Sequence, residues 1–356
     1  MAEVKVDVIN NSQGIAAVLS AKNISDPGTL RPWMNDKGEA YMTVHVGGSK
    51  SDLKNYKNIR VNAATLRRDE WKQLDEAIIP VAESRLSGIQ SLLSRGLVFN
   101  LGNAFGTTIL ESHAISDALE AALTMDGITR SKGDRQEFSH TYLPIPIVHV
   151  DYEINARVLE ASRRMGNPLD TTSAERAARK VAEKIESMLF SSATYSYGGG
   201  AIYSFLNFPH RNTDSLTAAW TSATPAQILG DVQSMKQANM DEGFFGPYIL
   251  YVPMAYETVL DSDYSVSGAS TMTIRERILK IKNIAAVEVV DTLTGNNVIM
   301  SQLTPDVVRV VNGMGLTNVE WKSEGNMVTQ YKVMAIQVPQ LRADFNNKCG
   351  ISHFSI

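Results

Sequence analysis

The chain has very little cysteine: Cys349 is the only one among its 356 residues. A single cysteine excludes an internal disulfide framework and is typical of a protein made in a reducing compartment. The first residues, MAEVKVDVINN, lack the basic and apolar segments of a secretory signal peptide. No apolar run approaches the roughly 18 residues that a membrane-spanning helix requires. The sequence therefore predicts a soluble protein without disulfides or a membrane span.

A strong charge of one sign is also missing. Lys and Arg number 34 and Asp and Glu number 38, which gives a formal net charge of −4. A protein that binds nucleic acid mainly through phosphate contacts would be markedly basic. Hydrophobic residues make up 44% and charged residues 20%, as in packed globular proteins. The length is enough for about two or three domains.

Motifs that carry catalysis or bind cofactors are not found. The six histidines form no HExxH or other close metal-binding pair, and no GxSxG nucleophile motif occurs. Glycines 198–200 follow a predicted helix and precede no GK[ST], so they are interpreted as a flexible connector. Asp261 and Asp263 lack the other ligands of a calcium loop and are interpreted as solvated. We expect no catalytic residue, no cofactor and no metal ligand, because no ionisable set converges as in an α/β enzyme.

Residues 1–65 differ from the rest because they contain two prolines, several glycines and no helical apolar period. Residues 41–46 predict one short strand, and the segment is interpreted as an extended arm with room for a hairpin. The helical region that follows, residues 66–96, has an apolar face made of Trp71, Leu74, Ile78 and Val81. Pro80 is expected to kink or split this helix.

Residues 97–150 are predicted to form a long two-stranded hairpin with its turn at TMDGITRSKGDR. Alternating charges at its tip suit solvent: Arg130, Lys132, Asp134 and Arg135. Such a hairpin has few apolar partners of its own and would be marginally stable in isolation. We therefore expect it to lie on a neighbour, in the same chain or in another.

The clearest helix spans residues 172–190. Thr172 with Glu175 three positions later predicts a capping box. The apolar stripe of this helix consists of Ala174, Ala177, Ala178, Val181, Ile185, Met188 and Leu189. At about 1.5 Å per residue the helix would extend roughly 28 Å.

Residues 203–304 alternate predicted helices and strands, which indicates a mixed α/β module. The helices are expected at 226–239, 253–260 and 273–281, and the strands at 248–252, 285–293 and 296–303. The strand 248–252 is apolar throughout, yet the stretch after it, DSDYSVSGAS, offers no catalytic set. Residues 305–356 are rich in predicted strands, which must pair with earlier parts of the chain.

The order of these parts resembles the Hong Kong 97-type major capsid protein of tailed bacteriophages, whose fold is shared with encapsulin shells. The resemblance covers about residues 65–356 and rests on TLRRDEWKQLDEAIIPVAESRL, LDTTSAERAARKVAEKIESMLF, FGPYILYVPMAYETVLDSDYS and VMAIQVPQLRADF. It implies an α+β fold with five parts. These are an N-terminal arm (1–65), a helix region (66–96), an extended loop (97–150), a peripheral domain with a long spine helix (151–202 and 305–356) and an axial α/β domain (203–304).

The resemblance also implies a structural function. The chain would self-assemble as hexamers and pentamers into an icosahedral shell around a double-stranded DNA genome, without sequence-specific contacts to the DNA. Its other partners would be a separate scaffolding protein, a portal and decoration proteins, and no membrane would be involved. The protein would be made in the cytoplasm of the host bacterium and would reside in the virion.

Two further expectations depend on this resemblance. The alternative function is that of an encapsulin-type nanocompartment shell around a cargo protein, although such shells are shorter and lack the N-terminal arm. The hairpin tip, with Arg130, Lys132, Asp134 and Arg135, becomes the candidate contact between subunits. Some relatives join neighbours by a Lys–Asn isopeptide bond; Lys132 would be the candidate donor here, and the sequence identifies no acceptor.

Overall fold

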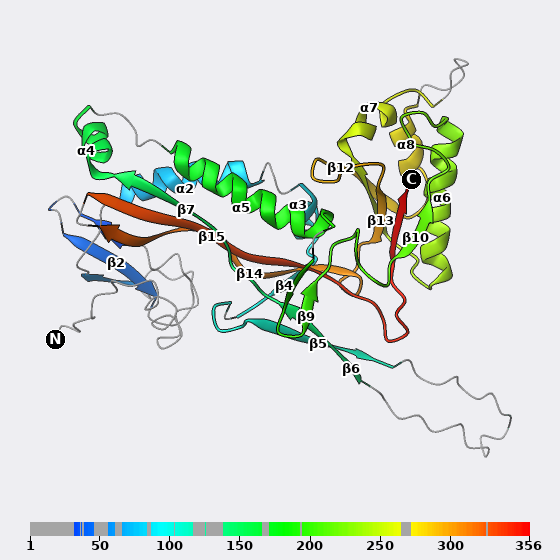
Figure 1. The fold of residues 1–356 in the computed structure, drawn as a ribbon, viewed down its shortest axis with the longest axis horizontal. Coiled ribbons are helices and arrows are strands. Elements are labelled where there is room, and N and C mark those ends of the chain that lie inside the picture. Colours follow the sequence, from blue (N-terminus) through cyan, green and yellow to red (C-terminus); the bar gives the residue numbers. More distant parts are fainter. Residues whose placement is uncertain are drawn as a thin grey trace.

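The computed structural model describes residues 32–35, 37, 39–45, 56–60, 66–83, 87–102, 104–116, 125, 138–165, 171–192, 194–264, 272–324 and 327–356. Within these residues three parts are visible in Figure 1. A long sheet carries helices on one face, a compact α/β part holds the C-terminus, and a two-stranded ribbon projects from the long sheet.

The long sheet has four strands. In spatial order they are β4 (Val98–Asn100), β14 (Val308–Glu324), β15 (Val328–Leu341) and β7 (Val148–Asn155). β14 and β15 form a long antiparallel pair, while β7 pairs only with the first part of β15, as far as Ala335. Pro339 lies beyond that point, opposite Val310 of β14, where β15 has a single neighbour and can accommodate a proline.

Four helices accompany the long sheet. They are α2 (Arg68–Glu83), α3 (Ser87–Ser94), α4 (Ala156–Met165) and α5 (Thr172–Phe190). The predicted apolar stripe of α5 is buried, apart from the half-buried Met188, and it packs into one core with side chains of β7, β14 and β15. The predicted long helix is thereby confirmed.

One local prediction about these helices is wrong, and so is one of the two alternatives predicted for Pro80. Thr171, not Thr172, precedes α5, and its hydroxyl donates to Glu175 Oε1 at 2.6 Å instead of accepting from the helix backbone, so no capping box forms. Pro80 does not split α2, which continues to Glu83. Pro80 is exposed in the last turn, and the buried Trp71, Leu74 and Ile78 before it hold the helix on the core.

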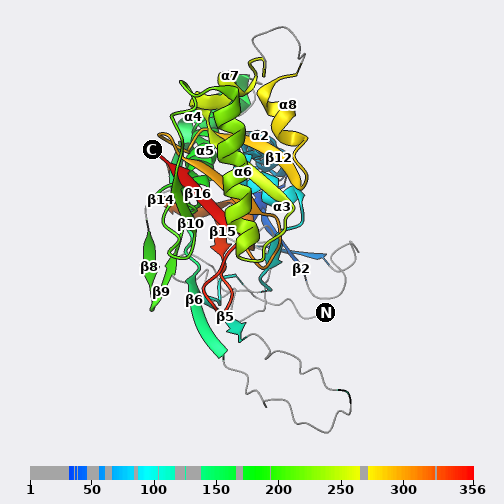
Figure 2. The same cartoon turned by 90° about the vertical axis from the view of Figure 1, so that its right-hand side faces the viewer.

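The compact part is built on a five-stranded mixed sheet. Its strands in order are β10 (Asn212–Ser215), β16 (Ile351–Ser355), β13 (Val298–Gln302), β11 (Tyr248–Pro253) and β12 (Ile284–Val290). Its helices are α6 (Pro225–Asp241), the 3-10 helix Met254–Tyr256, α7 (Glu257–Leu260) and α8 (Ile274–Leu279). Figure 2 shows α6 lying across this sheet. The predicted order of elements is confirmed, although Pro253 ends β11 and does not begin a helix.

The surroundings of β11 explain why the residues after Gly246 and Pro247 are apolar throughout. Ile249 and Tyr251 face the core that contains α5, whereas Tyr248, Leu250 and Val252 face the core under α6 and α8. A strand buried on both faces needs apolar side chains at every position. The strand therefore joins the compact part to the long sheet.

The last strand, β16, corrects the expected division of the chain. The sequence predicts that residues 305–356 lie together in the peripheral domain. β16 instead lies between β10 and β13 inside the five-stranded sheet, where it is parallel to β10 and antiparallel to β13. Its residues Ile351, Ser352, His353 and Phe354 are all buried, so the apolar faces of this sheet decide where the strand lies.

Two small β units complete the described fold. β1 (Pro32–Met34), β2 (Ala40–His45) and β3 (Tyr56–Arg60) form an antiparallel sheet, and β2 confirms the short strand expected there. β8 (Tyr195–Tyr197) and β9 (Gly200–Ile202) form a hairpin. Gly198 and Gly199 have positive φ at its turn, so the interpretation of residues 198–200 as a flexible connector is wrong.

Candidate functional site

The four charged residues expected at the hairpin tip, Arg130, Lys132, Asp134 and Arg135, lie outside the described residues. The described part of that hairpin is an antiparallel ribbon of β5 (Ile109–Ile115) and β6 (Phe138–Pro144). Its range is narrower than the expected 97–150, because β4 and β7 at the two ends pair with the long sheet.

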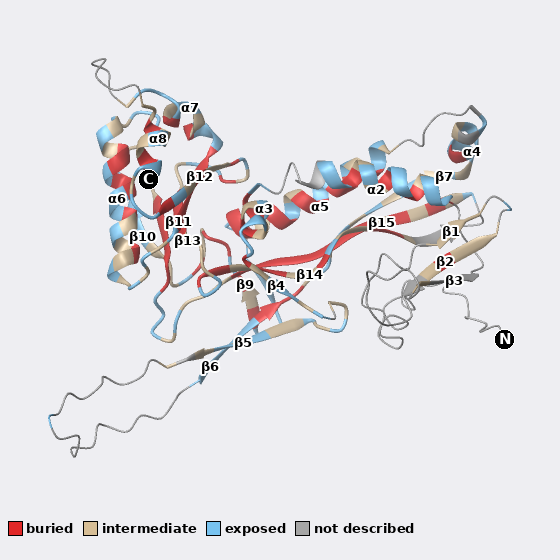
Figure 3. Cartoon of the chain, turned by 180° about the vertical axis from the view of Figure 1, so that it is seen from behind, coloured by how far each residue is buried: buried red, intermediate tan, exposed pale blue. Residues whose placement is uncertain are grey.

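The two faces of the ribbon have different surroundings. Leu110 and Leu143 on one face pack into a core with the long sheet, and Ser112 Oγ on the same face accepts from Gln340 Nε2 at 3.2 Å. Tyr142 and Phe138 alternate with these residues, and their side chains are 45% and 54% exposed. Figure 3 shows the ribbon pointing away from both cores, with exposed residues along β6. The described residues therefore leave aromatic surface of the ribbon uncovered.

The β8–β9 hairpin lies against the base of this ribbon. A Cβ atom on Gly200 would come within 2.2 Å of the Tyr142 carbonyl oxygen, so only glycine permits this approach. Tyr195 and Tyr197 of β8 are 48% and 56% exposed. We call the four exposed aromatic residues of the two neighbouring hairpins, Phe138, Tyr142, Tyr195 and Tyr197, the aromatic surface. Exposed aromatic side chains of this kind are characteristic of protein interfaces.

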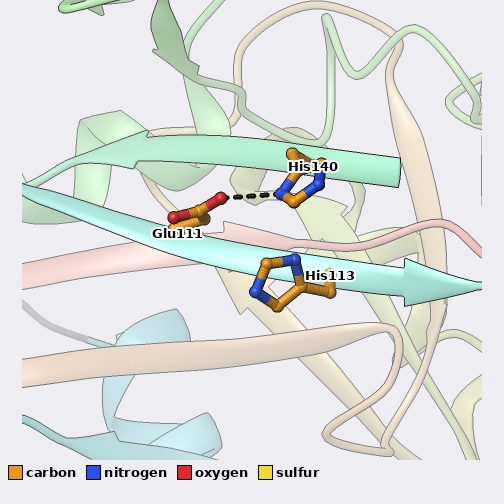
Figure 4. Close-up of side chains that lie close together, drawn as sticks. All are labelled: Glu111, His113 and His140. Atoms are coloured by element: carbon orange, nitrogen blue, oxygen red, sulfur yellow. Dashed lines mark hydrogen bonds and ion pairs between the residues drawn. The ribbon is translucent and has the colours of Figure 1, made fainter. Parts of the chain in front are cut away.

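A cluster of metal-binding residue types lies on the exposed face of the ribbon. Glu111, His113 and His140 have ligand atoms within 4.8 Å of one another, and all three side chains are exposed (Figure 4). His113 is directly opposite His140 in the strand register. Sequence reasoning missed this cluster because the pairing of residues 27 positions apart depends on the register. The only signal was Glu111 and His113 two positions apart on a predicted strand.

Glu186 is a buried acid where α5, α3 and the compact part meet. Its Oε1 accepts from the Gly88 backbone N–H at 2.7 Å, and its Oε2 accepts from that of Ile89 at 3.2 Å. The carboxylate thus satisfies free amide groups at the N-terminus of α3. On the next turn of α3, Ser91 Oγ lies 3.3 Å from the Tyr251 hydroxyl of β11.

Burial raises the pKa of Glu186 from 4.5 to about 7. The two backbone hydrogen bonds oppose this shift, and the nearby Asp291 adds to it. A perturbed acid can indicate a catalytic site. Glu186 is instead fully buried and bonded to the backbone, an arrangement that holds two helices together.

Three further residues of reactive types, Cys349, His353 and Asp261, are held in structural contacts. The Cys349 thiol is buried and donates to the His210 carbonyl at 3.0 Å, and burial raises its pKa to about 12. A thiol of that kind is a poor nucleophile at neutral pH. Burial and then the charge of Arg211 lower the pKa of His353 to about 4. Asp261 forms an exposed ion pair with Arg275 at 2.9 Å.

No helix among the described residues combines the length and the apolar character needed to cross a membrane.

Comparison with known proteins identifies shell proteins. The type 1 encapsulin shell protein EncA of Myxococcus xanthus (strain DK1622) is 26% identical over 214 residues, which is 59% of this chain and 69% of EncA. The structure of the virus-like particle from Pyrococcus furiosus matches this chain with a TM-score of 0.57 and 20% sequence identity. The match covers 80% of this chain and 98% of the particle's chain. The capsid of Myoviridae phage XM1 matches with a TM-score of 0.57 and 10% identity, over 76% of this chain and 91% of the capsid chain.

These likenesses confirm the expected α+β fold of the Hong Kong 97 type, a fold found in subunits of shells. A family of unknown function, DUF6260, matches residues 62–354, more than half of the chain. The chain therefore belongs to the DUF6260 family and has the fold of Hong Kong 97-type shell proteins.

Proposed function

We propose that this chain is the structural subunit of a closed protein shell, and more narrowly the major capsid protein of a tailed bacteriophage. The observation that carries the proposal is the projecting ribbon with its aromatic surface. Five of the seven residues of β6, Phe138 to Tyr142, are exposed in the single chain. A two-stranded ribbon is marginally stable without further apolar contacts, and neighbouring subunits of a shell would supply them.

A shell subunit requires repeated contacts with copies of itself that close by symmetry. The subunits would form hexamers and pentamers, and a separate scaffolding protein, a portal and decoration proteins would complete the particle. The protein would be made in the host bacterial cytoplasm and would reside in the virion.

The net charge of −4 bears on the contents of the shell. A subunit without basic excess gains little from counterion release on DNA, so it would enclose a genome without binding it tightly. Double-stranded DNA packaged by force through a portal needs no such attraction. Sequence-specific DNA contacts are not part of the proposal.

A second candidate is an encapsulin-type compartment around a cargo protein. The likeness of 26% to EncA favours it, since the sequence match is to a compartment shell. The N-terminal arm favours the capsid, because simple encapsulin shells lack such a segment. The described part of this arm includes β1 to β3, which lie before the family match begins at residue 62.

Electron microscopy of the purified chain tests the shell. Closed particles several hundred ångströms across would support it, and their absorbance ratio at 260 and 280 nm would separate DNA-filled capsids from cargo-filled compartments. Monomers that remain monomers on co-expression with the neighbouring genes for scaffolding candidates would refute the proposal. Closed particles that contain one co-purified enzyme and no nucleic acid would favour the second candidate.

A further inference from the structure

The antiparallel register of the ribbon brings together three side chains with metal-binding atoms. Glu111 and His113 are two positions apart on β5 and therefore lie on one face, and His140 of β6 is opposite His113. The imidazole rings of His113 and His140 meet edge to face with centroids 4.7 Å apart. His140 Nδ1 lies 2.7 Å from Glu111 Oε1, as the dashed line in Figure 4 marks.

This face of the ribbon is directed away from the chain's own cores. The alternate residues Leu110 and Leu143 contact the core beside the long sheet, so Glu111, His113 and His140 point to the opposite side. Glu111 and His140 keep 46% and 50% of their side-chain surface exposed. Solvent and dissolved ions therefore reach the cluster from outside, while its backbone is fixed by strand pairing.

Two imidazoles and one carboxylate form a donor set that suits divalent zinc. Zn²⁺ binds histidine nitrogen at about 2.0–2.1 Å and carboxylate oxygen at about 2.0–2.2 Å in tetrahedral geometry, so its donors lie about 3.3 Å apart. The ligand atoms here already lie within 4.8 Å of one another. Because the three side chains are exposed, small rotations about their side-chain bonds can close the remaining difference. Three protein ligands leave the fourth position to water.

We propose that Glu111, His113 and His140 bind a divalent transition-metal ion, with Zn²⁺ preferred, and that the ion links β5 to β6. The ion replaces the Glu111–His140 hydrogen bond with coordination by both residues and by His113. A link of this kind holds the register of the ribbon beyond the base that Leu143 anchors. The metal therefore prepares the ribbon as a rigid element before any other chain covers it.

Metal binding by the untagged full-length chain tests the proposal. After treatment with a chelator and dialysis, Zn²⁺ is titrated in competition with a chromophoric chelator, and Co²⁺ is titrated with its visible absorption as the signal. The variants are H113Q and H140Q, and the control is H149Q. His149 is an exposed histidine of β7 outside the cluster, so its replacement removes one surface imidazole and no proposed ligand.

The expected result is one Zn²⁺ per chain for the wild type and H149Q, with affinity lowered at least about tenfold in H113Q and H140Q. Co²⁺ should give the intense visible bands of a tetrahedral site only in the first two proteins. Equal binding by H113Q and H149Q, or none by the wild type, would overturn the site. Circular dichroism checks that each variant keeps its fold.

Hydrogen exchange tests the link between the strands separately. Zn²⁺ should slow exchange of backbone amides in 109–115 and 138–144 of the wild type and leave H113Q unchanged, because only a bridged ribbon opens less often. Stoichiometric binding without this protection would refute the link. The assay does not depend on whether the chain forms shells, so it can fail or succeed independently of the proposed function.

Discussion

Replacing Glu186 by Gln should remove a pH dependence from the stability of the fold. The wild-type carboxyl has a pKa of about 7 in the folded chain and an ordinary value of 4.5 when exposed. The folded state therefore binds this proton more tightly than the unfolded state does. The stabilisation is complete below about pH 4.5 and is lost as the pH rises through about 7.

The size of the effect follows from the shift. Each pKa unit corresponds to about 1.4 kcal/mol, so the wild type should lose roughly 2 to 3 kcal/mol of unfolding free energy between pH 5 and pH 8 from this group. E186Q keeps an oxygen that can accept from the Gly88 N–H but carries no charge at either pH. Its constant loss of the second acceptor, for Ile89, should be about 1 kcal/mol and independent of pH.

Thermal unfolding of the two proteins, followed by tryptophan fluorescence from pH 5 to pH 8, measures the difference. Both proteins must be in the same state of assembly, which light scattering checks at each pH. We expect E186Q to gain roughly 3–6 °C in melting temperature relative to the wild type across this interval. Both proteins contain all the other titrating groups, so the contributions of those groups cancel in the difference between the two melting temperatures. A difference in melting temperature that stays constant with pH would refute a raised Glu186 pKa.

Three further outcomes follow from the described contacts. Gly88→Ala should destabilise the chain by about 1–3 kcal/mol, because the added Cβ would lie 2.3 Å from the Phe190 ring. Gly230→Ala should stabilise it by about 0.5–1 kcal/mol, because Gly230 lies inside α6 with open space around the added Cβ. Chemical denaturation of both variants measures the two changes in unfolding free energy. Asp231→Ala should lower the unfolding free energy by about 2–4 kcal/mol, because this buried carboxylate accepts from two side chains and one backbone amide, and unchanged denaturation would contradict that role. Replacing Phe138 and Tyr142 together by Ser should leave the melting temperature of the single chain within about 1 °C but reduce particle yield in sedimentation, and normal particles would exclude the aromatic surface from assembly.

Helices and strands with a clear apolar period could be predicted from the sequence. The stripe of residues 172–190 and the apolar strand 248–252 were identified because burial on one or both faces leaves a direct pattern in the residues. The family resemblance came from the order of such elements. The correct predictions therefore came mainly from apolar patterns and from the order of the elements along the chain, and not from a short motif.

The errors arose where long-range pairing decides the structure. The position of β16 between β10 and β13 cannot be seen in a segment of five apolar and polar residues at the end of the chain. The cluster of Glu111, His113 and His140 likewise needs a register that the sequence does not give. Glycines 198–200 lie at a tight turn because β8 and β9 pair on either side of it. The residues that follow the helix give no sign in the sequence that these two short strands pair.

The placement of β16 has a consequence for the order of folding. β10 pairs with no strand of its sheet other than β16, and β16 is the last strand of that sheet in the chain. The five-stranded sheet therefore cannot be completed until every other strand of it has been synthesised. A chain without residues 351–355 would leave the edge of β13 and the underside of α6 uncovered. Loss of this one strand would thus separate β10 from the rest of its sheet.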